Sequence, residues 1–222
     1  MFDILKYREI KEFLKKNADY CQIVAISKNH PKESVLNALN SGVRIFGENR
    51  VNEARDKFSD LKAKYPDLQL HLTGPLQSNK VKLAASLFDV FHTLDREKIA
   101  LEFAKYKDQI KKKSFFIQVN TGMEDNKSGI YINELSDFID FCLRENELNI
   151  VGLMCIPPIN DDPNIHFSKL QKLAKENKID QISIGMSNDY LEAVKYSPTY
   201  IRLGSILFGK RKWRRRWPYI QI

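Results

Sequence analysis

The sequence lacks the features that define disulfide-rich, zinc-binding and membrane-spanning proteins. Its three cysteines are scattered, and no Cys or Cys/His spacing matches a zinc site or a disulfide framework. No apolar run approaches the ~20 residues that a membrane-spanning helix needs. The first residues carry charges where a signal peptide has its apolar core. These absences predict a cytoplasmic protein without a structural metal or a membrane span.

The net charge of +8 is concentrated at one end of the chain. Residues 210–222 hold six basic residues and no acidic one, which leaves 30 basic and 28 acidic residues in the other 209 positions. Basic residues interleaved with aromatics can contact nucleic acid or an anionic membrane surface. A nucleic-acid-binding protein is expected to have a basic body as well, and this body is nearly neutral. We therefore interpret residues 210–222 as a solvated basic and aromatic tail, and nucleic-acid binding stays an alternative.

Strand and helix patterns alternate along residues 1–209. An amphipathic helix is expected over residues 2–17, and no GxGxxG motif follows the first strand, which weakens a dinucleotide-binding interpretation. The expected strands are residues 22–28, 43–47, 69–73, 90–94, 115–120, 150–156, 181–186 and 200–205. Regular alternation with short connections indicates an α/β protein with a parallel sheet. Eight repeats favour a single TIM-type (β/α)8 barrel with an extra N-terminal helix over an open doubly wound sheet.

The first expected strand carries a lysine at its C-terminal end. Its central residues are all apolar, as in a strand buried on both faces. Alternation places Lys28 on the same face as Val24 and Ile26, at the mouth of whatever the strand lines. A lysine that is desolvated there is a candidate for imine formation with an aldehyde. A strand-end lysine that extends into water is the alternative.

The loops after the last two expected strands have the composition of an anion site. In TIM barrels the active site lies at the C-terminal ends of the strands, and phosphate is often held after strands seven and eight. Ser187 places a hydroxyl beside backbone N–H groups at a helix start. Gly204 allows a ligand close to the backbone, and Ser205 adds a second hydroxyl. Helix capping explains either loop alone, but the two together predict a phosphate site.

Strand eight also carries an arginine. Alternation turns Arg202 toward the barrel interior, where a guanidinium has to be paired or bound. A structural ion pair is the alternative. Strand eight closes against strand one in a barrel, which brings Arg202 and Lys28 to one site. An amine that forms imines, a phosphate site and an inward guanidinium are the groups that pyridoxal 5′-phosphate requires.

Six short motifs occur in order between about residues 22 and 211. They are Val24–Lys28, Phe46–Asn49, His71–Lys80, Gly152–Met154, Ser183–Ser187 and Ile201–Ser205. Together they resemble the motifs of the YggS/PROSC family, the pyridoxal phosphate homeostasis proteins. That family is related to the barrel half of alanine racemase. The resemblance therefore implies an alanine racemase-like barrel, the type III fold of proteins that use this cofactor.

The resemblance also assigns site residues. Those that it assigns to the cofactor are Lys28, Asn49, Ser187, Arg202, Gly204 and Ser205. By resemblance, Lys28 is the Schiff-base lysine, Arg202 faces the pyridine nitrogen, Asn49 lies beside the cofactor, and the two serines with Gly204 hold the phosphate. Proteins of the family bind the cofactor and buffer or deliver it. The expected partners are pyridoxal phosphate and the apoenzymes that receive it, and we expect a monomer.

An amino-acid racemase or decarboxylase of the same fold type is the main alternative function. Racemases of this class add a C-terminal β-domain that supplies a catalytic tyrosine, and the sequence after residue 209 is too short for one. We therefore predict a protein without efficient catalytic turnover, and no residue is assigned as catalytic. His71 and His92 lie on expected strands and are interpreted as hydrogen-bonded barrel residues rather than bases.

Overall fold

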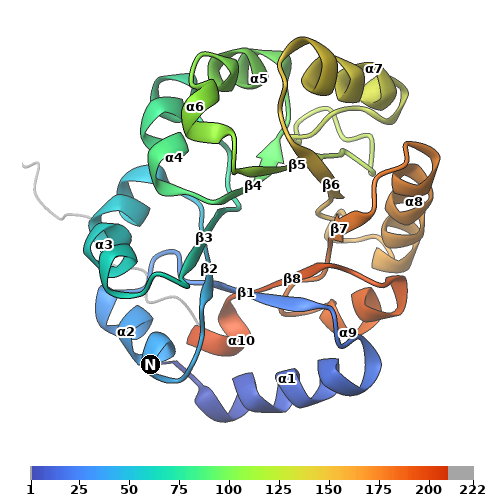
Figure 1. The fold of residues 1–222 in the computed structure, drawn as a ribbon. Helices are drawn as coiled ribbons and strands as arrows, with labels where there is room; N and C mark the ends of the chain where they lie inside the picture. The colour runs from blue at the N-terminus through green and yellow to red at the C-terminus, as the bar shows by residue number, and fades with distance from the viewer. Residues whose placement is uncertain (1, 210–222) are drawn as a thin grey trace, which may run out of the picture.

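The computed structural model describes residues 2–209, and in this range eight parallel strands close into a barrel (Figure 1). Each strand pairs with the next along the chain, and β8 pairs with β1 to complete the ring. The strands are β1 (Gln22–Ile26), β2 (Ile45–Glu48), β3 (Gln69–Leu72), β4 (Val90–Leu94), β5 (Ser114–Gln118), β6 (Ile150–Met154), β7 (Gln181–Ser183) and β8 (Tyr200–Leu203). The predicted barrel is confirmed, and the pairing of β8 with β1 excludes an open sheet.

Helices form a ring around the outside of the barrel (Figure 1). They are α1 (Ile4–Asn17), α2 (Lys32–Asn40), α3 (Val51–Lys64), η1 (Ser78–Lys80), α4 (Val81–Leu87), α5 (Glu97–Ala104), α6 (Lys107–Ile110), η2 (Ile132–Glu134), α7 (Leu135–Asp140), η3 (Phe141–Glu145), α8 (Pro163–Glu176), α9 (Tyr190–Ala193), η4 (Val194–Tyr196) and α10 (Ser205–Phe208). Outward strand residues pack against them, as where the rings of Phe46 and Phe58 lie 5.4 Å apart. The main core therefore lies between the sheet and the helices.

The predicted N-terminal helix is present as α1. Its first turn is capped by the Asp3 carboxylate, which accepts a hydrogen bond from the backbone N–H of Lys6 at 2.9 Å. The Asp3 N–H donates to the carbonyl of Leu207 at 2.7 Å, and the rings of Phe2 and Phe208 lie 5.3 Å apart. These contacts fasten the start of the chain to α10, the short helix that directly follows β8.

The interior of the barrel is narrow where β1 meets β2. A Cβ atom on Gly47 would lie 2.3 Å from Cδ1 of Ile26 and 2.9 Å from Cγ1 of Val24. Glycine is therefore required here by the close approach of the β1 side chains. The register of β1 and β8 pairs Val24 with Arg202. Neighbours in register share a face, so the predicted inward orientation of Arg202 is confirmed.

Six strands end earlier than the apolar patterns predicted: β1, β3, β5, β6, β7 and β8. The chain leaves β1 after Ile26, because the carbonyl of Ser27 accepts from the N–H of His30 at 3.1 Å and closes a turn. Lys28 thus lies in this turn, and its predicted place within the strand is wrong. Strands β7 and β8 also end before residues 186 and 205, and Gly185 bends the chain after β7 with a φ of +86°. The residues left over belong to the loops at the C-terminal ends of the strands.

Three expectations from the sequence concern the tail, a membrane span and a structural metal. The predicted tail, residues 210–222, lies outside the described residues. Within residues 2–209 no helix has the length and apolar character to cross a membrane. In the same range no group of three or more His, Cys, Asp or Glu side chains is placed to hold a metal ion.

Candidate functional site

A cavity of about 280 Å³ opens at the C-terminal ends of the strands. Its walls come from the ends of β1 and β8 and from the loops that follow β1, β2, β3, β6, β7 and β8. The lining residues are Ile26, Lys28, Asn49, Thr73, Ile156, Met186, Ser187, Asn188, Arg202, Gly204 and Ser205. All six residues predicted for the site are among them, although they come from four separate segments of the sequence.

The loops after β7 and β8 meet at one hydroxyl group. The Oγ atom of Ser187 accepts hydrogen bonds from the backbone N–H groups of Gly204, at 3.2 Å, and Ile206, at 3.4 Å. Two amides that converge on one oxygen form a concave site that suits a phosphate oxygen equally well. Ser205 lies between them in the sequence and also lines the cavity. The two loops that were predicted to bind an anion are therefore joined by hydrogen bonds from the backbone of one to the Ser187 hydroxyl of the other.

Arg202 lies at the cavity wall and is almost fully buried, with 5% of its surface exposed. Its guanidinium donates to the hydroxyl of Ser183 at 2.8 Å and to the carbonyl of Cys155 at 3.0 Å. Burial lowers the pKa of Arg202 from its usual value. Among the described residues no carboxylate lies within ion-pair distance of it, and the structural ion pair considered as an alternative is not found there. A charge buried with neutral partners favours a ligand that supplies a further acceptor.

A chain of hydrogen bonds runs from Arg202 across the barrel interior. A guanidinium only donates, so the Ser183 hydroxyl accepts from Arg202 and can give its own proton to Nδ1 of His92, 2.9 Å away. Nε2 of His92 then carries a proton and donates to Nδ1 of His71 at 3.0 Å. This order leaves a proton on Nε2 of His71, which has no partner among the described residues. The expectation of hydrogen-bonded histidines therefore holds fully for His92 and only in part for His71.

Both of these histidines are neutral. They have no exposed surface, and burial lowers the pKa of His71 to about 3. Burial, followed by the nearby His71 and Arg202, lowers the pKa of His92 well below its usual value. Neutral imidazoles can pass hydrogen bonds along the chain without adding charge next to Arg202.

The other two predicted residues follow β1 and β2. Lys28 is half-buried in the turn after β1 and contributes to the cavity wall. Asn49 directly follows β2, and its side-chain oxygen accepts from the Thr73 hydroxyl at 3.1 Å. The same hydroxyl lies 3.3 Å from the carbonyl oxygen of Glu48. Thr73 thus orients Asn49 at the cavity wall.

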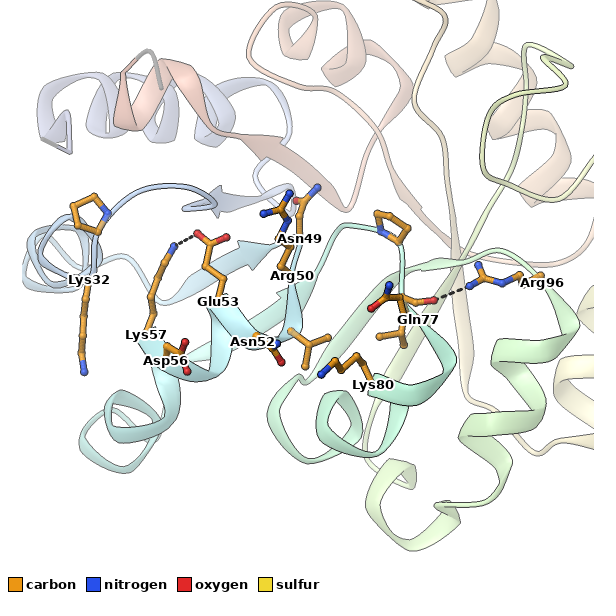
Figure 2. Close-up of a pocket in the computed structure, with 14 residues that line it drawn as sticks. Lys32, Asn49, Arg50, Asn52, Glu53, Asp56, Lys57, Gln77, Lys80 and Arg96 are labelled. Atoms are coloured by element: carbon orange, nitrogen blue, oxygen red, sulfur yellow. Dashed lines mark hydrogen bonds and ion pairs between the residues drawn. The ribbon is translucent and has the colours of Figure 1, made fainter. Parts of the chain in front are cut away.

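A wider cleft of about 1010 Å³ lies beside this cavity, and the two share Asn49 (Figure 2). Figure 2 shows that charged side chains of both signs line the cleft. Several are paired with protein groups, such as Lys57 with Glu53 at 2.8 Å and Arg96 with the carbonyl of Leu76 at 2.7 Å. Of the six predicted residues the cleft contains Asn49 alone. The smaller cavity is therefore where the candidate chemistry converges.

Several lining residues were not assigned to the site from the sequence. Thr73, Ile156, Met186 and Asn188 each follow the C-terminal end of a strand. That position is a usable signal, because parallel barrel strands end at one face. Their residue types, however, carry no distinctive chemistry, so the pattern alone did not single them out.

Comparison with known proteins identifies the family of the chain. The chain matches the family described as "Alanine racemase, N-terminal domain" over residues 6–212. It is 38% identical over 205 residues to the pyridoxal phosphate homeostasis protein of Vibrio cholerae, covering 87% of each chain. It is 33% identical over 206 residues to the protein of the same name from Escherichia coli K12, again covering 87% of each chain.

Solved structures give the same result. PipY of Synechococcus elongatus PCC7942, determined with PLP bound, superposes with a TM-score of 0.84 at 29% identity and covers 93% of this chain and 99% of its own. Alanine racemase from Acinetobacter baumannii has a TM-score of 0.71 at 17% identity, covering 94% of this chain and 62% of its own, and shows the shared fold alone.

The barrel and the cavity at its C-terminal face define a protein of the alanine racemase N-terminal domain class. Within that class, the chain belongs to the family of pyridoxal phosphate homeostasis proteins. The family predicted from the six sequence motifs is thereby confirmed.

Proposed function

We propose that this protein binds pyridoxal 5′-phosphate in the cavity at the C-terminal face of the barrel and takes part in its homeostasis as a carrier or buffer. One observation carries the proposal. A lysine, two serines beside Gly204 and a buried arginine all line a single cavity of about 280 Å³. Relatives at 33–38% identity are named pyridoxal phosphate homeostasis proteins, and PipY was determined with the cofactor bound.

The residues present fit the parts of the cofactor. Ser187, Gly204 and Ser205 would hold the phosphate, since hydroxyl and amide donors suit its charged oxygens. Arg202 would donate to the pyridine nitrogen, because its two partners in the protein are neutral oxygens that leave its charge uncompensated by direct contact. Asn49, held by Thr73, would lie at the edge of the ring.

When bound, the cofactor supplies an aldehyde that reacts reversibly with primary amines. Lys28 supplies the amine, and it is the only lysine among the described residues that line the cavity. Arg202 keeps its charge, so it opposes protonation of the pyridine nitrogen by like-charge repulsion and can only donate a hydrogen bond to it. The ring is thereby a poor acceptor of electrons from a substrate.

We infer that the protein does not turn over amino acids efficiently. Racemisation needs acid–base groups on both faces of the α-carbon. Among the described residues that line the cavity, Lys28 is the one side chain suited to that work, and no His, Asp, Glu, Cys or Tyr accompanies it. The homeostasis role for which the relatives are named supports the same reading. We further propose that the protein acts as a cytoplasmic monomer and that apoenzymes receive the cofactor from it.

A titration with pyridoxal 5′-phosphate tests this function. We expect a visible absorbance band in the wild-type protein and in Lys32→Ala, whose ammonium pairs with Asp60 outside the cavity. Lys28→Ala should lack the band and release the cofactor on dialysis. A band of wild-type intensity in Lys28→Ala would show that another amine binds the cofactor.

A further inference from the structure

The turn that carries Lys28 is held on both sides. The N–H of Ser27 donates to the carbonyl of Gly47 at 3.0 Å, and the carbonyl of Ser27 accepts from the N–H of His30 at 3.1 Å. Asn29 has a φ of +63°, in the left-handed region that asparagine tolerates better than most residues. Lys28 is therefore presented from a tight turn with a defined backbone shape.

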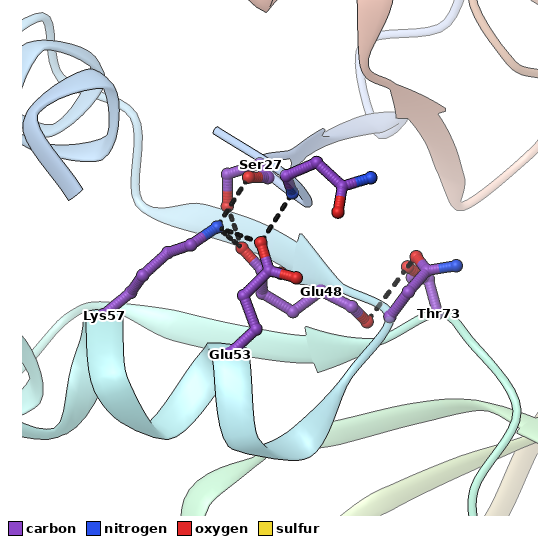
Figure 3. Close-up of polar contacts among 7 residues, drawn as sticks. Ser27, Glu48, Glu53, Lys57 and Thr73 are labelled. Carbon is purple, nitrogen blue, oxygen red and sulfur yellow. Dashed lines mark hydrogen bonds and ion pairs between the residues drawn. The ribbon is translucent and has the colours of Figure 1, made fainter. Parts of the chain in front are cut away.

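Four side chains hold this turn (Figure 3): one from the residue that follows β1, one from β2 and two from α3. We call Ser27, Glu48, Glu53 and Lys57 the lysine clamp. The ammonium of Lys57 donates to the carbonyl of Ser27 at 2.7 Å and to the carboxylates of Glu48 and Glu53, each at 2.8 Å. The Ser27 hydroxyl donates to the same Glu48 oxygen at 2.6 Å.

The clamp also reaches the other side of Lys28. The backbone N–H of Asn29 donates to Oε1 of Glu53 at 2.5 Å. Lys57 and Glu53 face each other one helical turn apart on α3, so a single helix holds the carbonyl before Lys28 and the amide after it. The two peptide groups that flank the Lys28 Cα atom are thereby fixed.

The charged groups of the clamp are buried, and burial of charges does not by itself stabilise the fold. Ser27 and Glu48 have no exposed surface, and 7% of Lys57 is exposed. One oxygen of Glu48, Oε2, has no partner among the described residues. Burial raises the pKa of Glu48, and Lys57 partly offsets that rise. Removing such charges from water costs more than an apolar contact of the same size would, so the charges need another explanation.

We propose that the lysine clamp, with Lys57 at its centre, positions Lys28 for its reaction with the cofactor aldehyde. The inference rests on the proposed function. A lysine side chain has a flexible four-carbon stem, so the place from which it starts decides how often its amine meets a bound aldehyde. Small displacements of a reacting group can lower a rate by as much as a hundredfold. Lys57 does not itself line the cavity and acts only through the Lys28 turn.

Two variants distinguish an effect of the clamp from a general effect of losing a lysine on α3. Lys57→Met removes the centre of the clamp. Lys62→Met is the matched control, because Lys62 also lies on α3, donates to the carbonyl of Leu87 at 2.9 Å and pairs with Asp89. Both changes remove one lysine that bridges a carbonyl and a carboxylate, but only the first touches the Lys28 turn.

A third variant covers the risk that Lys57→Met leaves Glu48 unpaired and fails to fold. Glu53→Ala keeps the buried pair of Lys57 and Glu48 and removes the acceptor of the Asn29 amide. Glu53→Gln restores an acceptor oxygen without the charge. We expect Glu53→Gln to recover most of what Glu53→Ala loses.

Two measurements decide the proposal. In the cofactor-free protein, hydrogen exchange should be at least about tenfold faster at the Asn29 amide in Glu53→Ala and Lys57→Met, and unchanged there in Lys62→Met. With pyridoxal 5′-phosphate, the first two variants should form the Lys28 link about ten- to a hundredfold more slowly than the control.

Each outcome has a separate meaning. Wild-type rates of link formation in both Glu53→Ala and Lys57→Met would overturn the clamp while leaving the proposed function intact. Equal exchange at Asn29 in all variants would overturn it as well. A wild-type protein that takes up no cofactor would instead refute the proposed function, and the exchange measurement would still show whether the clamp fixes the turn.

Discussion

The buried pair of His71 and His92 should make the stability of the barrel fall as the pH is lowered from 7.5 to 5. Both rings are fully buried, and the pKa of each is lowered by burial, to about 3 for His71. In the unfolded chain both pKa values return to about 6.5. As the pH falls through 6.5, the unfolded chain takes up protons that the folded protein does not, so folding becomes less favourable.

The size of the loss in free energy of unfolding is set by the pH range between the folded and the unfolded pKa of each histidine. At pH 5 the unfolded pKa of His71 lies about 1.5 units above the pH, and its folded pKa of about 3 lies below the pH. His71 then lowers the free energy of unfolding by about 2 kcal/mol, and His92, whose pKa burial also lowers, adds a loss in the same direction. For His71 the loss continues until the pH approaches its folded pKa of about 3.

Urea unfolding at pH 7.5, 6.5, 5.5 and 5.0 measures this loss. The matched variant is His71→Phe, which removes one titrating ring and keeps an aromatic side chain beside Tyr200, whose ring lies 5.1 Å from that of His71. Comparing the two proteins cancels the contribution of the carboxylates that both contain. We expect His71→Phe to lose about 2 kcal/mol less than wild type between pH 7.5 and 5. Equal losses in the two proteins would refute the assignment of a neutral, buried His71.

Three further predictions concern the cofactor and the packing of the barrel. Replacing both Ser187 and Ser205 by alanine should weaken retention of pyridoxal phosphate by about tenfold or more on dialysis, because hydrogen bonds to charged groups contribute about 1.5–3 kcal/mol each; retention at the wild-type level would place the phosphate elsewhere. The α-proton of alanine should exchange slowly in deuterated buffer, as followed by NMR, and rapid exchange that disappears in Lys28→Ala would indicate a racemase. Gly152→Ala should lower the free energy of unfolding by about 1–3 kcal/mol, since the new Cβ would lie 2.2 Å from Cε1 of Phe116; an unchanged urea midpoint would contradict this packing.

The barrel could be predicted because its physical signals are local. Strands buried on both faces appear as short apolar runs, and the helices between them show their own period. The ends of the strands were harder to predict from the sequence. Ser27 continues the apolar run of β1 as a small residue, and only the hydrogen bond from His30 to its carbonyl turns the chain away from the sheet. A turn of that kind depends on backbone angles that no periodic pattern encodes.

The candidate site could be predicted from the sequence for a related reason. Lys28, Arg202 and Ser187 follow or end strands, and a parallel barrel collects such positions at one face. The resemblance to a known family then added Asn49, which has no chemistry of its own to mark it. The structure places all of them around one cavity.

The groups that support the site were not predicted. Lys57 lies 29 positions after Lys28, and its contact with the Ser27 carbonyl exists only once α3 packs beside β1 and β2. The chain from Arg202 to His71 likewise joins β8, β7, β4 and β3 across the barrel interior. Such contacts depend on the register of the strands in the closed sheet, and this register cannot be predicted from a single sequence.

We propose that Lys28 forms the covalent link to pyridoxal 5′-phosphate. The most direct test is to load the protein with the cofactor, reduce it with borohydride, digest it and locate the modified lysine by peptide mass spectrometry. We expect a pyridoxyl group on Lys28 at close to one per protein chain. Modification of another lysine at that level, with Lys28 unmodified, would contradict it.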